Sequence, residues 1–503
     1  MSELGWAVWA ALALLLLYLL RVNQLLSQTP DEIRKLSGPR WTRAQLEATY
    51  KRLQDSPLDY TDKIPPKLDR RYVVTGGSAV SMPGLVGGYI VLQLLARGTP
   101  PECIRIVDIR RSERSDIGAG TAAAAVDFAQ ADIRSASAVT AAFARPWPAA
   151  AARLPLTVFH TAAVIEASER SPRRYAFPAA VNIDGTRHVL AAARAAGADV
   201  FSATSSGSIG LRPVGAFAAP WARAPRGFWQ VLDVADFQAP LRPRDGYFAN
   251  YAASKAVAER LVCGASGEAF RAGCIRPANG VYGNPTDNTV GDPLSRAILP
   301  TWTPHIVQSF VHGANVAIAH LHHEAVLARP WAESARQAGR PFVVTDPNPP
   351  IAYADVYAAI RTLSAHAFRT VEVPPVAILL LAHGLELYDE LALAAGGGVL
   401  PALAGDLRHL KPPIMSICTH LVAAGDEARR PPAEGGLGYA GVLTTLEGVA
   451  LEVLEWNREH AHASASAGAR KKYTTSVVLA EQIQRLPVTA PQAAAPSRGE
   501  TDG

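Results

Sequence analysis

Short apolar runs alternate along residues 70–262 with segments that favour helices. The apolar runs of strand length are 70–75, 103–108, a run ending at 131–133, 156–160 and 200–208. The helical segments that follow include about 134–153, 181–194 and 251–262. Strands that alternate with helices in this way are typical of a parallel sheet with helices on both faces. The pattern therefore predicts an α/β fold with a Rossmann-type, doubly wound parallel sheet.

The chain begins with an apolar run from Leu4 to Leu20 that carries no charged side chain. Its length is at the short end of what spans a bilayer. Glu3 is the only charged residue before it and no small-residue cleavage site follows, which disfavours a signal peptide. Basic residues follow from Arg21 onward, and the positive-inside rule places them in the cytosol. We therefore expect residues 1–21 to be a single-pass transmembrane helix.

The composition narrows the choice of partners. The chain has 503 residues, 49% of them apolar, and a net charge of +5. No Lys/Arg block is interleaved with aromatic residues, so nucleic acid is not indicated as a partner. The four cysteines form no CxxC, and the histidines from His312 to His323 have no second motif beside them. We therefore expect unpaired thiols in a reducing compartment and no bound metal.

A glycine cluster follows the first predicted strand. Dinucleotide-binding turns need glycine where the backbone turns tightly and approaches the pyrophosphate. The usual G-x-x-G-x-x-G spacing is restored here only if residues 79–83 are treated as an insertion. The cofactor contacts that this alignment predicts are Gly76, Gly77, Gly84 and Gly87, with an apolar helix behind them from about 89 to 95. A glycine-rich hairpin without a ligand is the alternative.

An acidic residue ends the second predicted strand. Asp108 is placed to accept hydrogen bonds from the adenosine ribose, which favours NAD as the cofactor. Arg110 and Arg111 follow directly and are able to tolerate a 2′-phosphate, so NADP stays open.

Two further strand ends offer cofactor contacts. Asp132 closes the third predicted strand and is expected to meet the adenine ring. Ala162 and Ala163 follow the fourth strand, where small residues let a cofactor lie against the backbone.

Tyr251 and Lys255 lie four residues apart, which places both on one face of the predicted helix. An isolated tyrosine hydroxyl has a pKa of about 10, and a nearby ammonium group favours the phenolate. The pair is therefore able to take a proton from an alcohol or return one to a carbonyl. A hydroxyl at the end of the fifth strand, Ser206 or Ser205, is suited to hold the substrate oxygen. Lys255 is also placed to hold the nicotinamide ribose.

Two segments have more than one interpretation. The long stretch between Ser206 and Tyr251 contains Trp221 and several prolines, and reads as a lid, a membrane-facing flap or an unordered insertion. Residues 373–403 are strongly apolar, but charged residues interrupt them and disfavour a second span. A helix in the membrane interface is one interpretation, and packing in the core or in a homodimer is the other.

These patterns divide the chain into five segments. After the anchor, residues 22–69 read as a polar stalk, and residues 70–272 as the NAD(P)-binding Rossmann domain. Residues 273–460 are mixed and loop-rich, as expected for a smaller substrate-binding region. Residues 461–503, rich in Ala, Ser, Pro and Gln toward the end, are expected to be disordered.

Several motifs occur in order over about residues 70 to 365. They are TGGS and GLVG, HTAA at 160–163, VNIDGTRHVL at 181–190, TSS at 204–206, YAASK at 251–255 and IRPANGVYG at 275–283. This series resembles extended short-chain dehydrogenases/reductases, and most of all the 3β-hydroxysteroid dehydrogenase/isomerase family. The resemblance implies that Tyr251, Lys255 and Ser206 are catalytic, that Pro277 lies beside the nicotinamide, and that the glycines, acids and alanines named above contact the cofactor.

The resemblance also implies a reaction, the NAD(P)-dependent oxidation of a 3β-hydroxysteroid or sterol to the 3-ketone. The lipophilic substrate and the anchor together suggest the membrane of the endoplasmic reticulum, with the catalytic domain cytosolic. A sterol-4α-carboxylate 3-dehydrogenase, whose β-keto acid product loses carbon dioxide, is one alternative. A nucleotide-sugar epimerase or dehydratase is another, and a non-catalytic NAD-binding scaffold is the alternative from a different class. The insertion at 79–83 and the long gap between Ser206 and Tyr251 depart from the family pattern.

Overall fold

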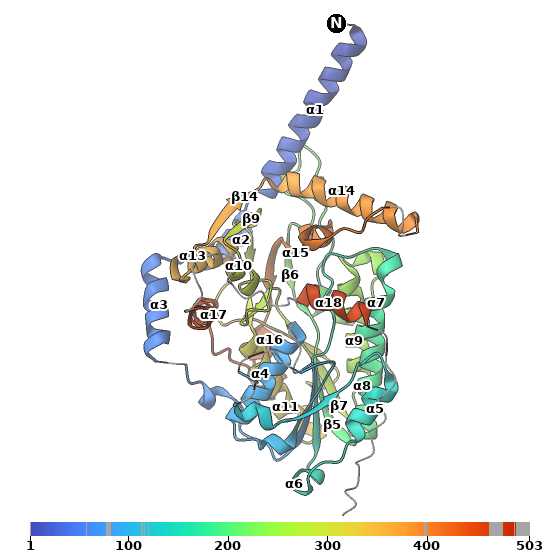
Figure 1. The fold of residues 1–503 in the computed structure, drawn as a ribbon, viewed down its shortest axis with the longest axis vertical. Coiled ribbons are helices and arrows are strands. Elements are labelled where there is room, and N and C mark those ends of the chain that lie inside the picture. Colours follow the sequence, from blue (N-terminus) through green and yellow to red (C-terminus); the bar gives the residue numbers. More distant parts are fainter. Residues whose placement is uncertain are drawn as a thin grey trace, which may run out of the picture.

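The computed structural model shows a long N-terminal helix that projects from a body built around one parallel sheet (Figure 1). It describes residues 2–56, 58–76, 82–111, 114, 116–118, 120–396, 400–461, 476–486 and 488. The expected cofactor contact Gly77 and residues 79–81 of the expected insertion lie outside the described residues.

The central sheet has seven strands in the order β12-β7-β5-β4-β1-β2-β3, and every neighbouring pair is parallel. The strands are β1 (Arg71–Thr75), β2 (Ile104–Asp108), β3 (Asp127–Gln130), β4 (Leu156–His160), β5 (Ala198–Thr204), β7 (Arg271–Pro277) and β12 (Pro341–Val344). The order reverses between β1 and β4, where a doubly wound sheet opens a ligand-binding crevice at its carboxyl edge. The predicted fold class is therefore confirmed.

Helices cover both faces of this sheet. One face carries α4 (Met82–Ala96) and α11 (Gly313–Leu327), and the other carries α5 (Ala136–Ala144), α8 (Gly185–Ala195) and α9 (Asn250–Gly264). Side chains alternate between the two faces along a strand. In β1, Val74 is therefore buried in the cluster under α4 and Val73 in the cluster under α8.

Some boundaries differ from those expected. β5 ends at Thr204 rather than at residue 208, because the Ser206 side chain caps a 3₁₀ helix that begins directly afterwards. β3 ends at Gln130, because the Asp132 carboxylate then accepts the Arg134 N–H at 2.9 Å and turns the chain. The expected domain boundary at residue 272 falls inside β7, so the sheet takes strands from both sides of that position.

The helix behind the glycine cluster is longer than predicted. It begins at Met82 rather than near residue 89. Pro83 stands in the first turn. Proline is favoured there because the N–H groups of the first turn have no acceptor within the helix, so a missing N–H costs nothing. Gly84 and Gly87 are consequently buried inside the first turns of α4 rather than in a loop ahead of it.

A second, smaller sheet lies beside the first and has the order β13-β10-β15-β6. Its strands are β6 (Trp229–Leu232), β10 (Val307–Gln308), β13 (Ile351–Ala352) and β15 (His420–Ala423), and two-stranded pairs form between β8 (Val281–Tyr282) and β11 (Val311–His312) and between β9 (Ile298–Thr301) and β14 (Arg369–Glu372). β6 belongs to the long stretch between Ser206 and Tyr251, and it pairs with β15 in parallel. Part of that stretch is thus an ordered strand.

The segment after the N-terminal helix packs onto the body. The elements are α1 (Glu3–Leu26), α2 (Asp31–Leu36), α3 (Arg43–Asp55), α13 (Tyr353–Leu363) and α17 (Thr445–Glu459). Ile33 of α2 is buried, and Leu46 and Leu53 of α3 are buried against α13 and α17. Residues 22–69, expected to be a stalk, therefore contribute side chains to the core.

The remaining helices lie at the periphery. They are α6 (Ala149–Ala152), α7 (Ala176–Pro178), α10 (Gly291–Ser295), α12 (Trp331–Ser334), α14 (Pro375–Ala394), α15 (Pro413–Ile417), α16 (Asp426–Arg429) and α18 (Ser476–Arg485). α14 extends sideways from the base of α1, and α18 lies close to α7 and α9 in the same view (Figure 1). α18 falls within the tail that was expected to be disordered; most of that tail lies outside the described residues.

Candidate active site

A cavity of about 80 Å³ lies at the carboxyl ends of β4, β5 and β7. The residues that line it and matter for chemistry are Thr161, Ala163, Ser206, Tyr251, Lys255 and Pro277. Three sheet strands and α9 thus bring the expected catalytic residues and two of the expected cofactor contacts to one place. Cavities that hold a small-molecule ligand usually have volumes of roughly 300–1,000 Å³, so this one is the size of a fragment of a dinucleotide.

Tyr251 lies in the first turn of α9, and its side chain is buried against the cavity. Burial raises its pKa to about 12, although a hydrogen bond with Ser206 acts in the opposite direction. Desolvation disfavours the charged phenolate more than that hydrogen bond favours it. The expected lowering of this pKa by Lys255 is therefore not what the structure shows.

Lys255 is held by the backbone at the end of β5. Its Nζ donates to the Thr204 carbonyl oxygen at 2.7 Å. Burial lowers its pKa to about 8, while the neighbouring Cys274 and Glu259 act to raise it. Lys255 is thus able to lose its proton near neutral pH, which few lysines do.

The two candidate serines have different surroundings. The Ser205 hydroxyl donates to Glu259 at 2.6 Å. The Ser206 hydroxyl lies 2.7 Å from that of Ser208 and hydrogen-bonds to Tyr251. Because Ser205 is committed to a carboxylate, Ser206 is the hydroxyl beside Tyr251 that is better placed to meet a substrate oxygen.

A buried ion pair supports this strand end from behind. Arg276 contacts Glu259 at 2.7 and 2.5 Å, and both side chains are 1% exposed. Asp236, from the stretch between Ser206 and Tyr251, accepts from the same guanidinium at 2.7 Å. These carboxylates raise the pKa of Arg276. The pair ties α9 to β7 and holds Ser205 at the same time.

Asn182 makes a connection that the sequence interpretation did not assign. It lies in a π-helical turn, Ala179–Asp184, that leads into α8. Its Nδ2 donates to the Ser254 hydroxyl at 2.9 Å, and its Oδ1 accepts the Val164 N–H at 2.9 Å. Asn182 therefore joins α9 to the loop after β4, one residue beyond Ala163. π-helical turns are frequent at functional sites, and the VNIDGT motif is the sequence signal for this one.

Three of the expected cofactor residues lie where the backbone or a carboxylate meets a dinucleotide in this fold. Gly76 has a φ of +75°, and a Cβ there would lie 2.7 Å from the Ala162 nitrogen. Glycine thus lets the ends of β1 and β4 approach each other at the crevice. Asp108 is buried at the end of β2, with its carboxylate accepting the Ile109 N–H at 2.7 Å. The glycine, the alanine and the acid fit a dinucleotide bound at the carboxyl edge.

α18 lies across the part of this edge beyond Asp108. Gln482 accepts from Arg110 at 3.3 Å, and the Leu486 carbonyl accepts from Arg134 at 3.2 Å. Ala480 is buried in the cluster that contains Val107 of β2. Residues after β2 and β3 hold the adenosine half of a dinucleotide in this fold. α18 thus covers the place where adenosine is expected.

Asp132 has a strong partner in the same region. Arg134 contacts its carboxylate at 2.6 Å, and both side chains are largely buried. The expected contact of Asp132 with adenine therefore requires that one carboxylate oxygen of Asp132 remain accessible beside Arg134.

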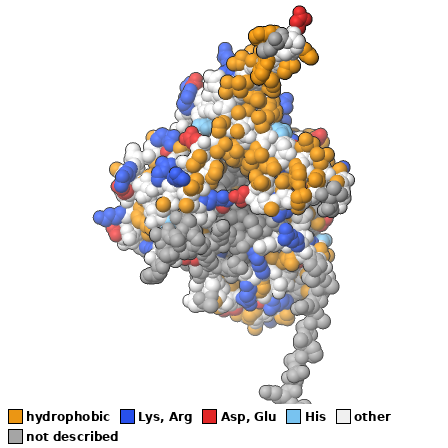
Figure 2. Space-filling model, turned by 45° about the horizontal axis from the view of Figure 1, so that its top comes forward, with side chains coloured by type: hydrophobic (Ala, Val, Ile, Leu, Met, Phe, Trp, Pro, Cys, Tyr) orange, Lys and Arg blue, Asp and Glu red, His pale blue; other side chains and the backbone are white. Residues whose placement is uncertain are grey.

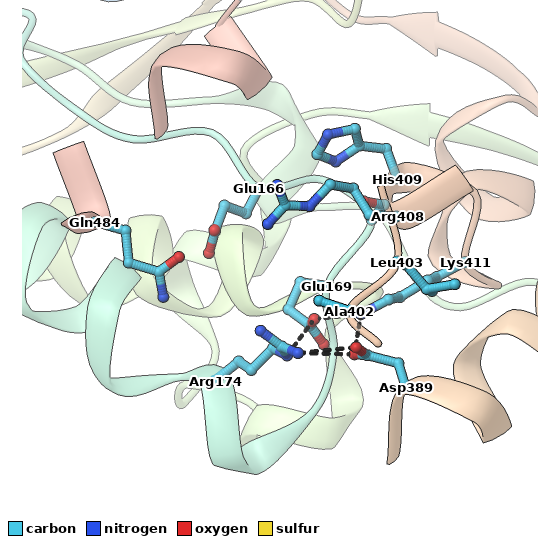
Figure 3. Close-up of a pocket in the computed structure, with 11 residues that line it drawn as sticks. Glu166, Glu169, Arg174, Asp389, Ala402, Leu403, Arg408, His409, Lys411 and Gln484 are labelled. Carbon is cyan, nitrogen blue, oxygen red and sulfur yellow. Dashed lines mark hydrogen bonds and ion pairs between the residues drawn. The ribbon is translucent and has the colours of Figure 1, made fainter. Parts of the chain in front are cut away.

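A second pocket, of about 110 Å³, adjoins the first, since Ile165 lines one and Glu166 the other. Lys411 donates to Glu169 and to Asp389 at 2.7 Å each, and these charges converge on one side of the pocket (Figure 3). Burial and the neighbouring Glu169 raise the pKa of Glu166 to about 7. No motif of the sequence pointed to this charged group, because its members come from three separate segments.

The comparisons with known proteins identify the family of the chain. The family model described as 3-beta hydroxysteroid dehydrogenase/isomerase matches residues 73–212 and 238–368, more than half of the chain. A second model, described as male sterility protein, matches residues 155–297. The chain belongs to the 3-beta hydroxysteroid dehydrogenase/isomerase family.

Individual proteins resemble the chain less closely. The 3beta-hydroxysteroid-dehydrogenase/decarboxylase isoform 2 of Arabidopsis thaliana is 24% identical over 396 residues, which cover 76% of this chain and 61% of that protein. The UDP-glucose 4-epimerase of Thermotoga maritima is 17% identical with a TM-score of 0.50, covering 78% of this chain and 100% of the epimerase. That of Thermus thermophilus is 20% identical with a TM-score of 0.47, covering 76% and 97%. The Thermotoga maritima epimerase shows the fold alone.

Proposed function

We propose that the protein oxidises the 3β-hydroxyl group of a sterol or steroid to the ketone, with NAD as the acceptor. The observation that carries the proposal is the meeting of Ser206, Tyr251 and Lys255 in one cavity at the carboxyl edge of the sheet. Membership of the family supports the reaction class. The roles that we propose for these three side chains follow from the chemistry of alcohol oxidation.

The alcohol loses a proton from oxygen and a hydride from carbon. Ser206 donates a hydrogen bond to the substrate oxygen, and Tyr251 accepts its proton. Bound NAD supplies the acceptor for the hydride and a positive charge. Burial raises the pKa of Tyr251 to about 12, and this pKa has to fall for Tyr251 to act as the base. The positive charge of the nicotinamide would favour the phenolate and so lower the pKa. Lys255 holds the nicotinamide ribose and adds a second positive charge while it is protonated.

We propose that NAD is preferred over NADP. Asp108 is buried at the end of β2, where a carboxylate accepts from a ribose and repels a 2′-phosphate. The second guanidinium that follows has another contact, because Arg111 stacks over the Phe128 ring at 4.7 Å. The proposed cofactor contacts remain Gly76, Gly77, Gly84, Gly87, Asp108, Asp132, Ala162, Ala163, Lys255 and Pro277.

A second candidate is the oxidation of a 4-carboxysterol followed by loss of carbon dioxide. The name of the Arabidopsis relative, which is a dehydrogenase/decarboxylase, favours it. Oxidation at C3 gives a β-keto acid, from which carbon dioxide leaves readily, so the same three side chains suffice for the step at C3.

We propose that α1 anchors the enzyme in the membrane of the endoplasmic reticulum, with the catalytic part cytosolic. α1 contains an 18-residue window with mean hydropathy 1.9, and none of that window is buried inside the protein. A helix of this length and composition is able to cross a bilayer. The basic residues that follow support the cytosolic side.

The test is a panel of substrates given to the full chain in membranes. NADH formation would be followed with 3β-hydroxysteroids, 4-carboxysterols and UDP-sugars, and carbon dioxide release with the 4-carboxysterols. We expect NADH from a sterol or steroid class, and carbon dioxide in addition if the second candidate holds. Turnover of UDP-sugars alone would overturn the proposal, and NAD binding without turnover of any substrate would favour a scaffold.

A further inference from the structure

α14 exposes several leucines and pairs charged side chains with the body, which is unusual for a helix on the surface of a soluble protein. The side chains that it exposes are Leu380, Leu381, Leu387 and Leu391, between 44% and 61% exposed. Two of its three charged residues pair with the body, where Glu386 contacts Arg170 at 2.6 Å and Asp389 contacts Lys411 at 2.7 Å. Figure 3 shows Asp389 directed at this group of charges. An ordinary surface helix buries its apolar face and exposes its charges.

α14 is also joined to the helix of membrane-spanning length. Val22 and Leu26 of α1 are buried in one cluster with Ile378 and Leu379 of α14. The Val376 N–H donates to the Asn23 side chain at 3.2 Å. The exposed leucines of α14 therefore begin close to the point where α1 leaves the body.

A loop of the long stretch between Ser206 and Tyr251 extends the same surface. Arg21 donates to the carbonyl oxygens of Pro220 and Ala222, at 3.1 and 2.9 Å, which fixes the loop to α1. Between them, Trp221 is 85% exposed. The ring of Phe217, 47% exposed, lies 5.5 Å from that of His383 on α14.

These contacts make one continuous apolar surface of α1, α14 and the loop. Figure 2 shows hydrophobic side chains gathered over the projecting helix and over the neighbouring shoulder of the body. Tryptophan and arginine are enriched at the boundary between membrane and water, and Trp221 and Arg21 stand together at the end of the apolar run. Contiguous apolar surface of this kind marks a site for membrane or protein partners.

We propose that α14 and the loop around Trp221 lie in the surface of the membrane that α1 enters. The leucines of α14 bury their side chains at the boundary between headgroups and acyl chains, as in an interfacial amphipathic helix. The body then contacts the bilayer through both α1 and the α14 surface, which restricts its orientation more than α1 alone would. Continuity with α1 favours lipid over a second protein, because any lipid around α1 also reaches this surface.

The test uses the full chain in phosphatidylcholine bilayers, with a nitroxide label at one position at a time. The labelled variants are Leu387→Cys and Leu391→Cys on α14, Glu47→Cys on α3 as the control, and Leu15→Cys on α1. Collisions with oxygen report lipid, and collisions with a water-soluble nickel chelate report solvent. The native cysteines Cys103, Cys263 and Cys274 are buried, and the unsubstituted chain measures any background from Cys418.

We expect the α14 labels to collide several-fold more with oxygen, and several-fold less with the nickel chelate, than the label on α3. Chelate collisions at both α14 positions equal to those at position 47 would overturn the proposal. Spin–spin broadening at positions 387 and 391 without oxygen contact would also overturn it and show a second copy of the chain instead. The label at position 15 reports the anchor separately, so a failure of the anchor and a failure of the α14 surface are distinguishable.

Discussion

Lys255 donates a hydrogen bond to the carbonyl oxygen of Thr204 at 2.7 Å, and this bond joins helix α9 to the end of β5. The contact places the ammonium at the backbone of the strand rather than against the phenol of Tyr251. Burial lowers the pKa of Lys255 to about 8, whereas burial raises that of Tyr251 to about 12. The charge state of Lys255 therefore changes within the range where the enzyme can be assayed.

This shift predicts an alkaline limb in the pH profile of oxidation. Lys255 is protonated below a pH of about 8, and its positive charge is lost as the pH rises through that value. We expect kcat/KM to fall above this pH in the unsubstituted enzyme. In Lys255→Arg the charge persists to high pH, so the residual activity should show no such limb. An alkaline limb that is unchanged in this variant would exclude Lys255 as its source.

The two adjacent serines provide a matched pair of variants. Ser206→Ala removes the hydroxyl beside Tyr251, and loss of one such donor to a reacting oxygen typically lowers kcat by about 10²–10³. Ser205→Ala removes the donor to Glu259 and should lower stability with a much smaller effect on kcat. Steady-state kinetics and thermal unfolding of both variants check the assignment. Equal losses of kcat would mean that Ser206 has no special role.

The C-terminal helix should compete with the cofactor. α18 contacts Arg110 and Arg134, which follow the strands expected to hold adenosine. Binding of NAD there requires α18 to leave, so removal of residues 476–503 should lower the KM for NAD several-fold without changing kcat. Titration of NAD against the truncated and full chains measures this. An unchanged KM would contradict competition: either the adenosine binds elsewhere, or displacement of α18 requires no measurable free energy.

The ion pair behind the active site should contribute to stability. Arg276 and Glu259 are each 1% exposed, and removal of one partner of a buried pair typically costs about 3–5 kcal/mol. Arg276→Met should therefore lower the free energy of unfolding by about that amount. The double variant Arg276→Met/Glu259→Gln leaves no unpaired buried charge, and we expect it to be more stable than the single variant. Denaturant unfolding of both compares them directly.

Local patterns were sufficient to predict five of the seven strands of the central sheet, and the helix that carries Tyr251 and Lys255. Apolar runs bounded by glycine and proline gave the strand positions within a few residues, and the spacing of Tyr251 and Lys255 predicted that both face one side of α9. Both now line the same cavity. These features depend on residues close in the sequence, which is why the sequence alone predicts them.

Features that depend on distant contacts were not predictable in this way. The high pKa of Tyr251 follows from burial by several elements, which no spacing reveals. The exposed leucines of α14 are explained only once Glu386 and Asp389 are known to pair with Arg170 and Lys411 on the side that faces the body. The charges in this helix disfavoured a second span, but their partners lie more than twenty residues away and were not apparent.

The most direct test of the account is turnover and NAD binding in Tyr251→Phe. The substitution removes one oxygen from a buried ring, and Tyr50→Phe on α3 is the control for loss of a phenolic oxygen away from the cavity. General base catalysis contributes about 10²–10⁴ in rate, so we expect kcat to fall by that factor while the Kd for NAD stays unchanged. Full activity in Tyr251→Phe, with the control also active, would contradict the central claim that this hydroxyl takes the proton from the substrate.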